Sequence, residues 1–168
     1  IRNYLIACHG AEEAHGYEAD DMLGIYQTDD TIAIHCDKDI NMIPGKHFNT
    51  MKDLHWESSE LGYIDDDTGC GLAQFYLQLL TGDMTDNIPP LPKNKRQGWG
   101  RAGAVRVLGG CTTEKDYLET VVALCRDLLD SGWCDRLKEQ ADLVWICRDR
   151  EQKGSDYLVQ KLEEYSVC

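Results

Sequence analysis

The sequence is poor in basic residues and has no long apolar run. Its 168 residues contain 17 Lys and Arg against 30 Asp and Glu, which gives a net charge of −13. No apolar stretch approaches the roughly 20 residues that a membrane-spanning helix needs, and no signal peptide opens the chain. We therefore expect no membrane partner and a cytoplasmic location.

Several familiar site patterns are also missing. The eight cysteines form no Cys-x-x-Cys pair, so a structural zinc site is not expected, and the chain lacks the short, loop-rich character of a secreted disulfide framework. We expect reduced thiols. The glycine-rich phosphate loop of nucleotide hydrolases is also missing, which argues against that activity.

Composition and length indicate a folded protein. With 42% hydrophobic and 28% charged residues, the chain is typical of a globular protein rather than a disordered tail. Its length suits one domain, or one and a half, with a real core. The acidic balance argues at first against nucleic acid as a partner, but net charge is a sum and binding is local.

The apolar pattern predicts an α/β region followed by a helical one. Residues 1–8 are consistent with a helix end that leads to a strand. Residues 31–36 are short and β-branched, which predicts a buried strand. Helical spacing and capping residues predict helices over 17–26, 72–80, 113–129, 137–147 and 156–165.

Three tight acidic groups stand where predicted elements begin or end. One opens a helix, one follows the predicted strand at 31–36, and one follows the helix at 72–80. If the chain stays extended after that strand, the two-residue spacing of the second group aims both side chains the same way. The seven carboxylates are Glu18, Asp20, Asp21, Asp37, Asp39, Asp83 and Asp86.

Seven carboxylates in one cleft would not all stay ionised without cations. Hard divalent ions with oxygen ligands solve that problem, so Mg²⁺ or Mn²⁺ is expected, and two such ions clamp a phosphodiester. The alternative is that each group is a solvated cap or turn. A further run, Asp65 to Asp67, lacks the glycine and glutamate of a calcium loop and is interpreted as a solvated turn.

A basic island interrupts this acidic chain between residues 92 and 108. It contains five cationic and no acidic residues, and Gly98 to Ala104 is typical of a glycine-rich turn that opens a helix. Such a segment can grip a phosphate backbone. The alternative is a flexible basic loop that pairs with the acidic surface. The cationic residues are Lys93, Lys95, Arg96, Arg101 and Arg106.

Three segments together resemble one known family. Gly16 to Asp21, Cys36 to Asp39 and Gly82 to Pro89 match, in order and spacing, the 5′-nuclease family. This family includes flap endonucleases, the 5′→3′ exonuclease domain of bacterial DNA polymerase I and phage exonucleases, and the chain is most similar to a phage version. The resemblance implies an α/β, PIN-like core over 1–88, then a helix–hairpin–helix-like DNA-binding element and C-terminal helices over 89–168.

The resemblance also implies a two-metal site for Mg²⁺ or Mn²⁺. In it, Glu18 and Asp20 match the first ion site, with Asp21 close by, and Asp37 can serve either ion. Asp39, Asp83 and Asp86 match the second site. The implied nucleic-acid-binding residues are Lys93, Lys95, Arg96, Gly98, Gly100 and Arg101, with K⁺ bound at the helix–hairpin–helix-like element.

The implied reaction is divalent-metal-dependent hydrolysis of DNA as a 5′→3′ exonuclease or flap endonuclease. The implied partner is duplex DNA with a 5′ end or flap, or an RNA–DNA hybrid, and for a phage protein the location is the host cytoplasm. The family's first strand, with an early metal-binding aspartate, and its helical arch have no counterpart here. We therefore expect the C-terminal part of a longer enzyme, or one half of a split one.

Two other interpretations remain open. The chain is alternatively a catalytically incomplete nuclease fragment that acts as a DNA-binding module. The third interpretation is an acidic divalent-ion binder unrelated to nucleic acid, which leaves the basic island unexplained.

Overall fold

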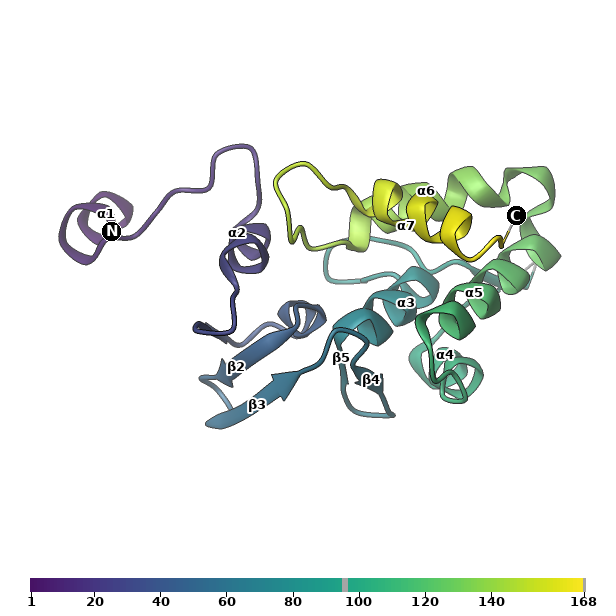
Figure 1. The fold of residues 1–168 in the computed structure, drawn as a ribbon, viewed down its shortest axis with the longest axis horizontal. Helices are drawn as coiled ribbons and strands as arrows, with labels where there is room; N and C mark the ends of the chain where they lie inside the picture. The colour runs from purple at the N-terminus through teal and green to yellow at the C-terminus, as the bar shows by residue number, and fades with distance from the viewer. Residues whose placement is uncertain (95–96, 168) are drawn as a thin grey trace.

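The computed structural model describes residues 1–94 and 97–167, and this part is a mixed α/β structure. It contains seven α-helices, two short 3₁₀ helices and three small sheets (Figure 1). Within these ranges no helix combines the length and the apolar character needed to cross a bilayer.

The chain opens with two short helices. Helix α1 (Arg2–His9) has no buried residue and stands apart from the rest of the molecule in Figure 1. The predicted strand after it is wrong, because Gly10 adopts φ 65° and ends the helix in a loop. Helix α2 (Ala19–Tyr26) is confirmed, with Glu18 at its N-cap and acidic residues in its first turn.

A three-stranded sheet follows in the order β1-β2-β3. Strand β1 (Ile32–His35) pairs in parallel with β2 (Gly45–Asn49), which pairs antiparallel with β3 (Leu54–Ser58). The predicted strand is confirmed, but its complete burial is wrong. Ala33 and His35 are buried, whereas Ile32 and Ile34 are 50% and 61% exposed, because only one face of this edge strand is covered.

Helix α3 (Gly71–Thr81) is the centre of the fold, as Figure 1 shows. Each residue from Gly71 to Leu80 is buried, and the helix packs against the 3₁₀ helix η1 (Asp39–Met42) on the sheet side. The prediction of a helix over 72–80 is confirmed. Because this helix is enclosed on all sides, the few polar residues that it carries must face internal hollows or bury their hydrogen-bonding groups.

Four further helices surround α3 and complete the core. They are α4 (Arg101–Leu108), α5 (Glu114–Leu129), α6 (Trp133–Val144) and α7 (Gly154–Glu164), with the 3₁₀ helix η2 (Asp130–Gly132) before α6. The predicted helices of this region are confirmed to within a few residues. Leu128, near the end of α5, is 37% exposed and lies outside the core. One apolar cluster runs from Met42 to Leu162 and joins the two halves of the chain.

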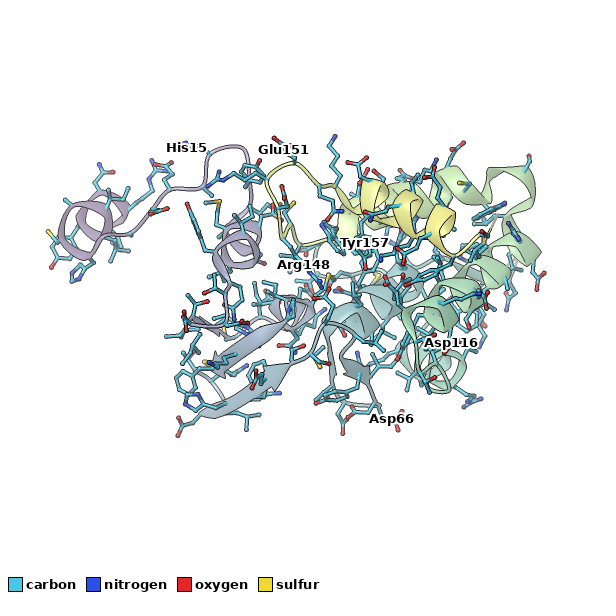
Figure 2. The ribbon with its side chains drawn as sticks, in the orientation of Figure 1. His15, Asp66, Asp116, Arg148, Glu151 and Tyr157 are labelled. Atoms are coloured by element: carbon cyan, nitrogen blue, oxygen red, sulfur yellow. The ribbon has the colours of Figure 1, made fainter. Side chains whose placement is uncertain are left out.

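Two hairpins connect these elements. The first pairs β4 (Tyr63–Ile64) with β5 (Gly69–Cys70), and Figure 2 shows Asp66 at its tip. In its turn the Asp65 carboxylate accepts hydrogen bonds from the backbone N–H groups of Asp67 and Thr68, which confirms the predicted solvated turn. The second hairpin pairs β6 (Pro92–Asn94) with β7 (Gln97–Gly98).

A carboxylate network ties the helices together around α3. The hydroxyl groups of Tyr76, Tyr157 and Tyr165 all donate to Glu114, at 3.1 Å from Tyr76 and 3.2 Å from Tyr165. The Lys161 ammonium lies 3.5 Å from the same carboxylate. Hydrogen bonds to a charged, largely buried acceptor are stronger than neutral ones, so this group links α3, α5 and α7.

The Glu114 network predicts a specific loss of stability. Glu114→Ala leaves the buried Tyr76 hydroxyl unpaired, so we expect the free energy of unfolding to fall by about 2–4 kcal/mol. Glu114→Gln keeps one acceptor oxygen and should lose less. Urea unfolding measures both. Glu119→Ala, which removes an exposed carboxylate on the same helix, is the control, and an equal loss in the two alanine variants would contradict this role.

Candidate metal centre

The end of helix α3 places the first carboxylate of the site. Gly82 adopts φ 60°, and a Cβ there would lie 2.3 Å from the Ile88 carbonyl oxygen, so this sharp turn requires glycine. The turn sets Asp83 opposite Ile88, with backbone hydrogen bonds of 3.0 and 2.7 Å between them. The Thr85 N–H donates to Asp83 at 2.7 Å. Asp83 is only 4% exposed, so its charge depends on these partners.

The segment after β1 contributes Asp37 and Asp39 in two directions. The Asp39 N–H donates to the Asp37 carboxylate at 3.0 Å, and Asp39 begins η1. The chain is therefore not extended here, so the condition on which the expected common direction of the two side chains depended is not met. Asp39 lines an acidic hollow, whereas Asp37 lines a separate cleft together with Lys38.

Two buried histidines, His35 and His47, hold this turn through hydrogen-bonding contacts with backbone carbonyl groups. A ring nitrogen of His35 lies 2.7 Å from the Asp37 carbonyl oxygen, and the other lies 3.1 Å from His47. His47 in turn lies 2.9 Å from the Ile43 carbonyl oxygen. Burial lowers the pKa of both imidazoles, which pack inside the sheet region.

The structure gathers six of the seven predicted carboxylates around one acidic hollow. The hollow lies between α2, η1, the end of α3 and the segment after α6. In the described part of the chain one trio, Asp39, Asp83 and Asp86, has ligand oxygens within 4.8 Å of one another. The six carboxylates are Glu18, Asp20, Asp21, Asp39, Asp83 and Asp86.

The carboxylate of Asp21 is occupied by backbone donors. It accepts hydrogen bonds from the N–H of Glu18 at 3.1 Å and from the N–H of Cys147 at 2.9 Å. Gly24, one turn later, approaches Cys147 so closely that a Cβ would lie 2.3 Å from its carbonyl oxygen. Asp21 therefore fixes α2 against the segment after α6 and positions Glu18 and Asp20 at the hollow.

Lys38 is the cation that the acidic hollow already contains. Its ammonium forms an ion pair with Asp83 and lies 3.6 Å from Asp39, while its own side chain is 59% exposed. These two carboxylates raise the pKa of Lys38 although burial opposes them. The exposed stem allows the ammonium to leave the hollow without disturbing the fold.

Asp83, which is buried, and Asp39, which is partly buried, have pKa values shifted in opposite directions. Burial raises the pKa of Asp39 to about 6, and the nearby carboxylates of Asp83 and Asp37 add to that rise. Burial also acts on Asp83, but hydrogen bonds from Lys38 and from Thr85 hold its pKa below the usual value. Burial and the charge of Asp37 raise the pKa of Asp20. Burial and neighbouring carboxylates therefore oppose ionisation of Asp39 and Asp20, whereas hydrogen bonds from Lys38 and Thr85 favour ionisation of Asp83.

Gln78 is a site residue that the sequence analysis missed. Its amide nitrogen donates to Asp39 at 2.6 Å, and its Oε1 is buried without a hydrogen-bond partner among the described residues. Gln78 is 4% exposed and lines the acidic hollow. A buried acceptor without a partner is unusual and indicates that a donor or a cation belongs beside it. The available signal was a pair of amides, Gln74 and Gln78, spaced by one turn on an otherwise apolar helix.

The basic island is divided among several structural roles. Lys93 lies over the Trp99 ring at 5.2 Å, and Trp99 is 6% exposed, so this indole packs in the core and cannot stack on a base. Gly98 packs against the Pro90 ring, and Gly100 is the N-cap of α4. Lys95 and Arg96 lie outside the described residues.

Arg101 also has a structural partner set. Its guanidinium donates to the carbonyl oxygens of Asp65, Asp66 and Thr68, at 3.1, 2.9 and 2.7 Å. It therefore fastens α4 to the turn of the β4–β5 hairpin. Part of its donor capacity is already used, so any phosphate at this point would compete with those carbonyl groups.

Comparisons with protein-family models, with curated proteins and with solved structures found no match to this chain.

The position of Lys38 predicts a metal-dependent change in stability. Lys38→Met leaves Asp83 buried without its cation, so in EDTA we expect the melting temperature to fall by roughly 2–8 °C. Mg²⁺ should then raise the melting temperature of Lys38→Met more than that of the unaltered chain, because the ion no longer competes with an ammonium group.

Differential scanning fluorimetry with and without Mg²⁺ makes this comparison. Lys115→Met, which removes an exposed lysine from α5, is the matched control. An equal response to Mg²⁺ in all three proteins would show that Lys38 does not stand in for an ion.

Proposed function

We propose that this chain is the metal-binding and DNA-binding part of a 5′→3′ exonuclease or flap endonuclease that hydrolyses DNA phosphodiester bonds. The observation that carries the proposal is the convergence of carboxylates from three separate segments on one hollow, where Asp39, Asp83 and Asp86 form a trio. These are the segments on which the resemblance to 5′-nucleases rests.

The residues of the trio fit a hard divalent cation. Three carboxylates supply oxygen ligands, and the unpaired Oε1 of Gln78 lines the same hollow. An acidic cluster alone is common without an ion, so the buried amide oxygen is the stronger argument for one. A bound Mg²⁺ or Mn²⁺ would polarise the phosphodiester and lower the pKa of a bound water.

The first ion site of the proposed pair is less complete. Glu18 and Asp20 line the same hollow, and the charge of Asp37 is near enough to raise the pKa of Asp20. Because Asp21 is held by backbone donors, its proposed role is to position α2 rather than to bind an ion directly. For the complete enzyme we propose a two-metal mechanism, in which these carboxylates would hold two ions that neutralise the charge on the phosphodiester.

The protein side of the reaction is mainly positioning. The N–H of Thr85 and the amide of Gln78 orient the carboxylates of Asp83 and Asp39. Lys38 balances the charge before an ion binds and is free to contact a phosphate oxygen once it has been displaced.

The proposed grip on DNA is at the β6–β7 hairpin and the start of α4. Gly100 caps α4 without a side chain, so a phosphate oxygen can approach the first N–H groups of that helix. Lys93 and Arg106 add positive charge nearby. Lys95 and Arg96 remain proposed DNA-binding residues of this segment. A helix–hairpin–helix-like element with bound K⁺ is part of the proposal for this region.

Strand β1 supports the proposal that another segment completes the nuclease. In the described part of the chain β1 pairs only with β2, and Ile32 and Ile34 are exposed on its outer face. A free strand edge beside exposed apolar residues is suited to the addition of a strand. If cleavage requires that segment, this chain by itself is a DNA-binding module without nuclease activity, which is the alternative function.

The proposal predicts a loss of metal binding and cleavage in one variant. Asp83→Asn removes the most buried ligand of the trio, so we expect Mn²⁺ affinity to fall more than about tenfold and any cleavage to disappear. DNA affinity should hardly change. Isothermal titration with Mn²⁺ and cleavage of a 5′-labelled duplex with a short overhang in Mg²⁺, Mn²⁺ and EDTA measure these effects.

Asp127→Asn is the control, because Asp127 is exposed on α5 away from the hollow. Unchanged Mn²⁺ binding in Asp83→Asn would show that the trio is not the ion site. If the unaltered chain binds Mn²⁺ and DNA but does not cleave, the DNA-binding module is favoured. Cleavage should then appear only after the completing segment is added.

The raised pKa of Asp39 predicts how metal affinity depends on pH. With a pKa of about 6, Asp39 is largely protonated at pH 5, so a proton and the ion compete for the same oxygen. Mn²⁺ affinity should therefore rise with pH through about 6 and level off above it. Asp39→Asn should bind more weakly and lose this rise. An affinity that is flat between pH 5 and 7.5 in the unaltered chain would contradict the assignment.

A further inference from the structure

A second cleft lies beside the acidic hollow. It has a volume of about 220 Å³, and it is lined by Lys38, whose ammonium pairs with Asp83 of the hollow. Its walls come from the segment after β1, the β2–β3 turn, the β4–β5 hairpin and α3. Drug-sized ligands occupy pockets of roughly 300–1,000 Å³, so this cleft suits something smaller, of the size of a single base.

The floor of the cleft carries an amide without a partner. Gln74 is 4% exposed and lines the cleft, and its side chain has no hydrogen bond to any described residue. Opposite it, Gly69 has no side chain, and a Cβ there would lie 2.3 Å from the Gln74 Oε1. The missing side chain of Gly69 makes room for the Gln74 amide itself, and the amide lines the cleft with hydrogen-bonding groups that a polar ligand can use.

An aromatic surface forms another wall. One face of the Trp56 indole stacks on His47, with ring centroids 4.9 Å apart and an angle of 8° between the planes. The rest of Trp56 lines the cleft, and Tyr63, 53% exposed, stands at its mouth. The stack on His47 fixes the indole, so a flat ligand meets a rigid platform.

Cationic residues outnumber acidic ones around the cleft, although the protein is strongly acidic. Lys38, Lys52 and Arg101 line it with only Asp37 and Asp67 as acidic residues. Lys38 is paired with Asp83, and Arg101 with backbone carbonyl groups. Lys52 has no ion pair within the described residues, so its ammonium is free for an anionic ligand.

We propose that this cleft binds one unpaired nucleotide, with its base against Trp56 and Gln74 and its phosphate at Lys52. Amide side chains form paired hydrogen bonds to base edges, aromatic rings stack on any base, and a lysine provides the phosphate contact. The proposal rests on the proposed nuclease function. It adds that a base lodged here would hold its strand beside the carboxylates, because Asp37 lines the cleft and Asp39 the hollow.

Mononucleotide binding without metal tests the proposal directly. We would titrate the chain in EDTA with each 2′-deoxynucleoside 5′-monophosphate and follow the indole N–H signals by NMR, using deoxyribose 5-phosphate as the probe without a base. At least one mononucleotide should shift the Trp56 signal at millimolar concentration, and the sugar phosphate should not. A set of mononucleotides that leaves the Trp56 signal unmoved would overturn the proposal.

Variants then assign the contacts. Gln74→Leu should weaken binding about tenfold, as loss of a paired amide contact to a base does. Lys52→Met should make the nucleotide bind no better than its nucleoside, and Lys115→Met is the control. Wild-type affinity in both Gln74→Leu and Lys52→Met would refute the proposal. If Gln74→Leu does not fold, Tyr63→Ala at the exposed mouth replaces it, with weaker binding expected for purines.

The same samples separate this proposal from the proposed function. Asp83→Asn should lower Mn²⁺ affinity more than about tenfold and leave mononucleotide binding intact, whereas Gln74→Leu should weaken mononucleotide binding about tenfold and leave Mn²⁺ binding intact. Mononucleotide binding without Mn²⁺ binding in the unaltered chain would remove the metal site and keep the cleft. Mn²⁺ binding without mononucleotide binding would remove the cleft alone.

Discussion

Mutual repulsion of carboxylates at the end of helix α3 constrains the whole site. Oxygens of Asp39, Asp83 and Asp86 come within 4.8 Å of one another, and at an effective dielectric of about 20 each pair of charges at that distance costs about 3–4 kcal/mol. Several such terms are comparable with the entire stability of a domain, so a cation or a proton beside these carboxylates is strongly favoured. Lys38 supplies the positive charge, and the raised pKa of Asp39 means that a proton binds there as the pH falls through about 6.

The rest of the fold holds these charges together. Helix α3 is enclosed by the sheet side and by four helices, so its end cannot move away from η1, and Gly82 turns Asp83 back toward it. The segment after α6 closes the other side. There Arg148 forms an ion pair with Glu60 and donates a hydrogen bond to the Met42 carbonyl oxygen at 2.8 Å. Its guanidinium also lies over the Trp145 ring. Figure 2 labels Arg148 near the middle of the view, between α2 and α3.

Much of this arrangement could be predicted from the sequence, because helical periodicity and capping residues are local. The helices and the grouping of six carboxylates follow from such patterns. The strands over 45–58 were missed, since their pairing depends on a partner elsewhere in the chain. Lys38, Gln74 and Gln78 were missed for a related reason, because a polar residue becomes a site residue only when packing buries it beside a hollow. Trp99 is the opposite case. It stands beside basic residues in the sequence, as a nucleic-acid-binding aromatic residue would, but it is buried in the core.

A crystal structure with Mn²⁺, recorded at a wavelength where manganese scatters anomalously, tests the central claim most directly. The account predicts an anomalous peak among Asp39, Asp83 and Asp86, with the Lys38 ammonium displaced from Asp83 and the Gln78 Oε1 turned toward the ion or its water. A Mn²⁺-saturated crystal in which Lys38 still occupies the hollow and the trio carries no peak would contradict it.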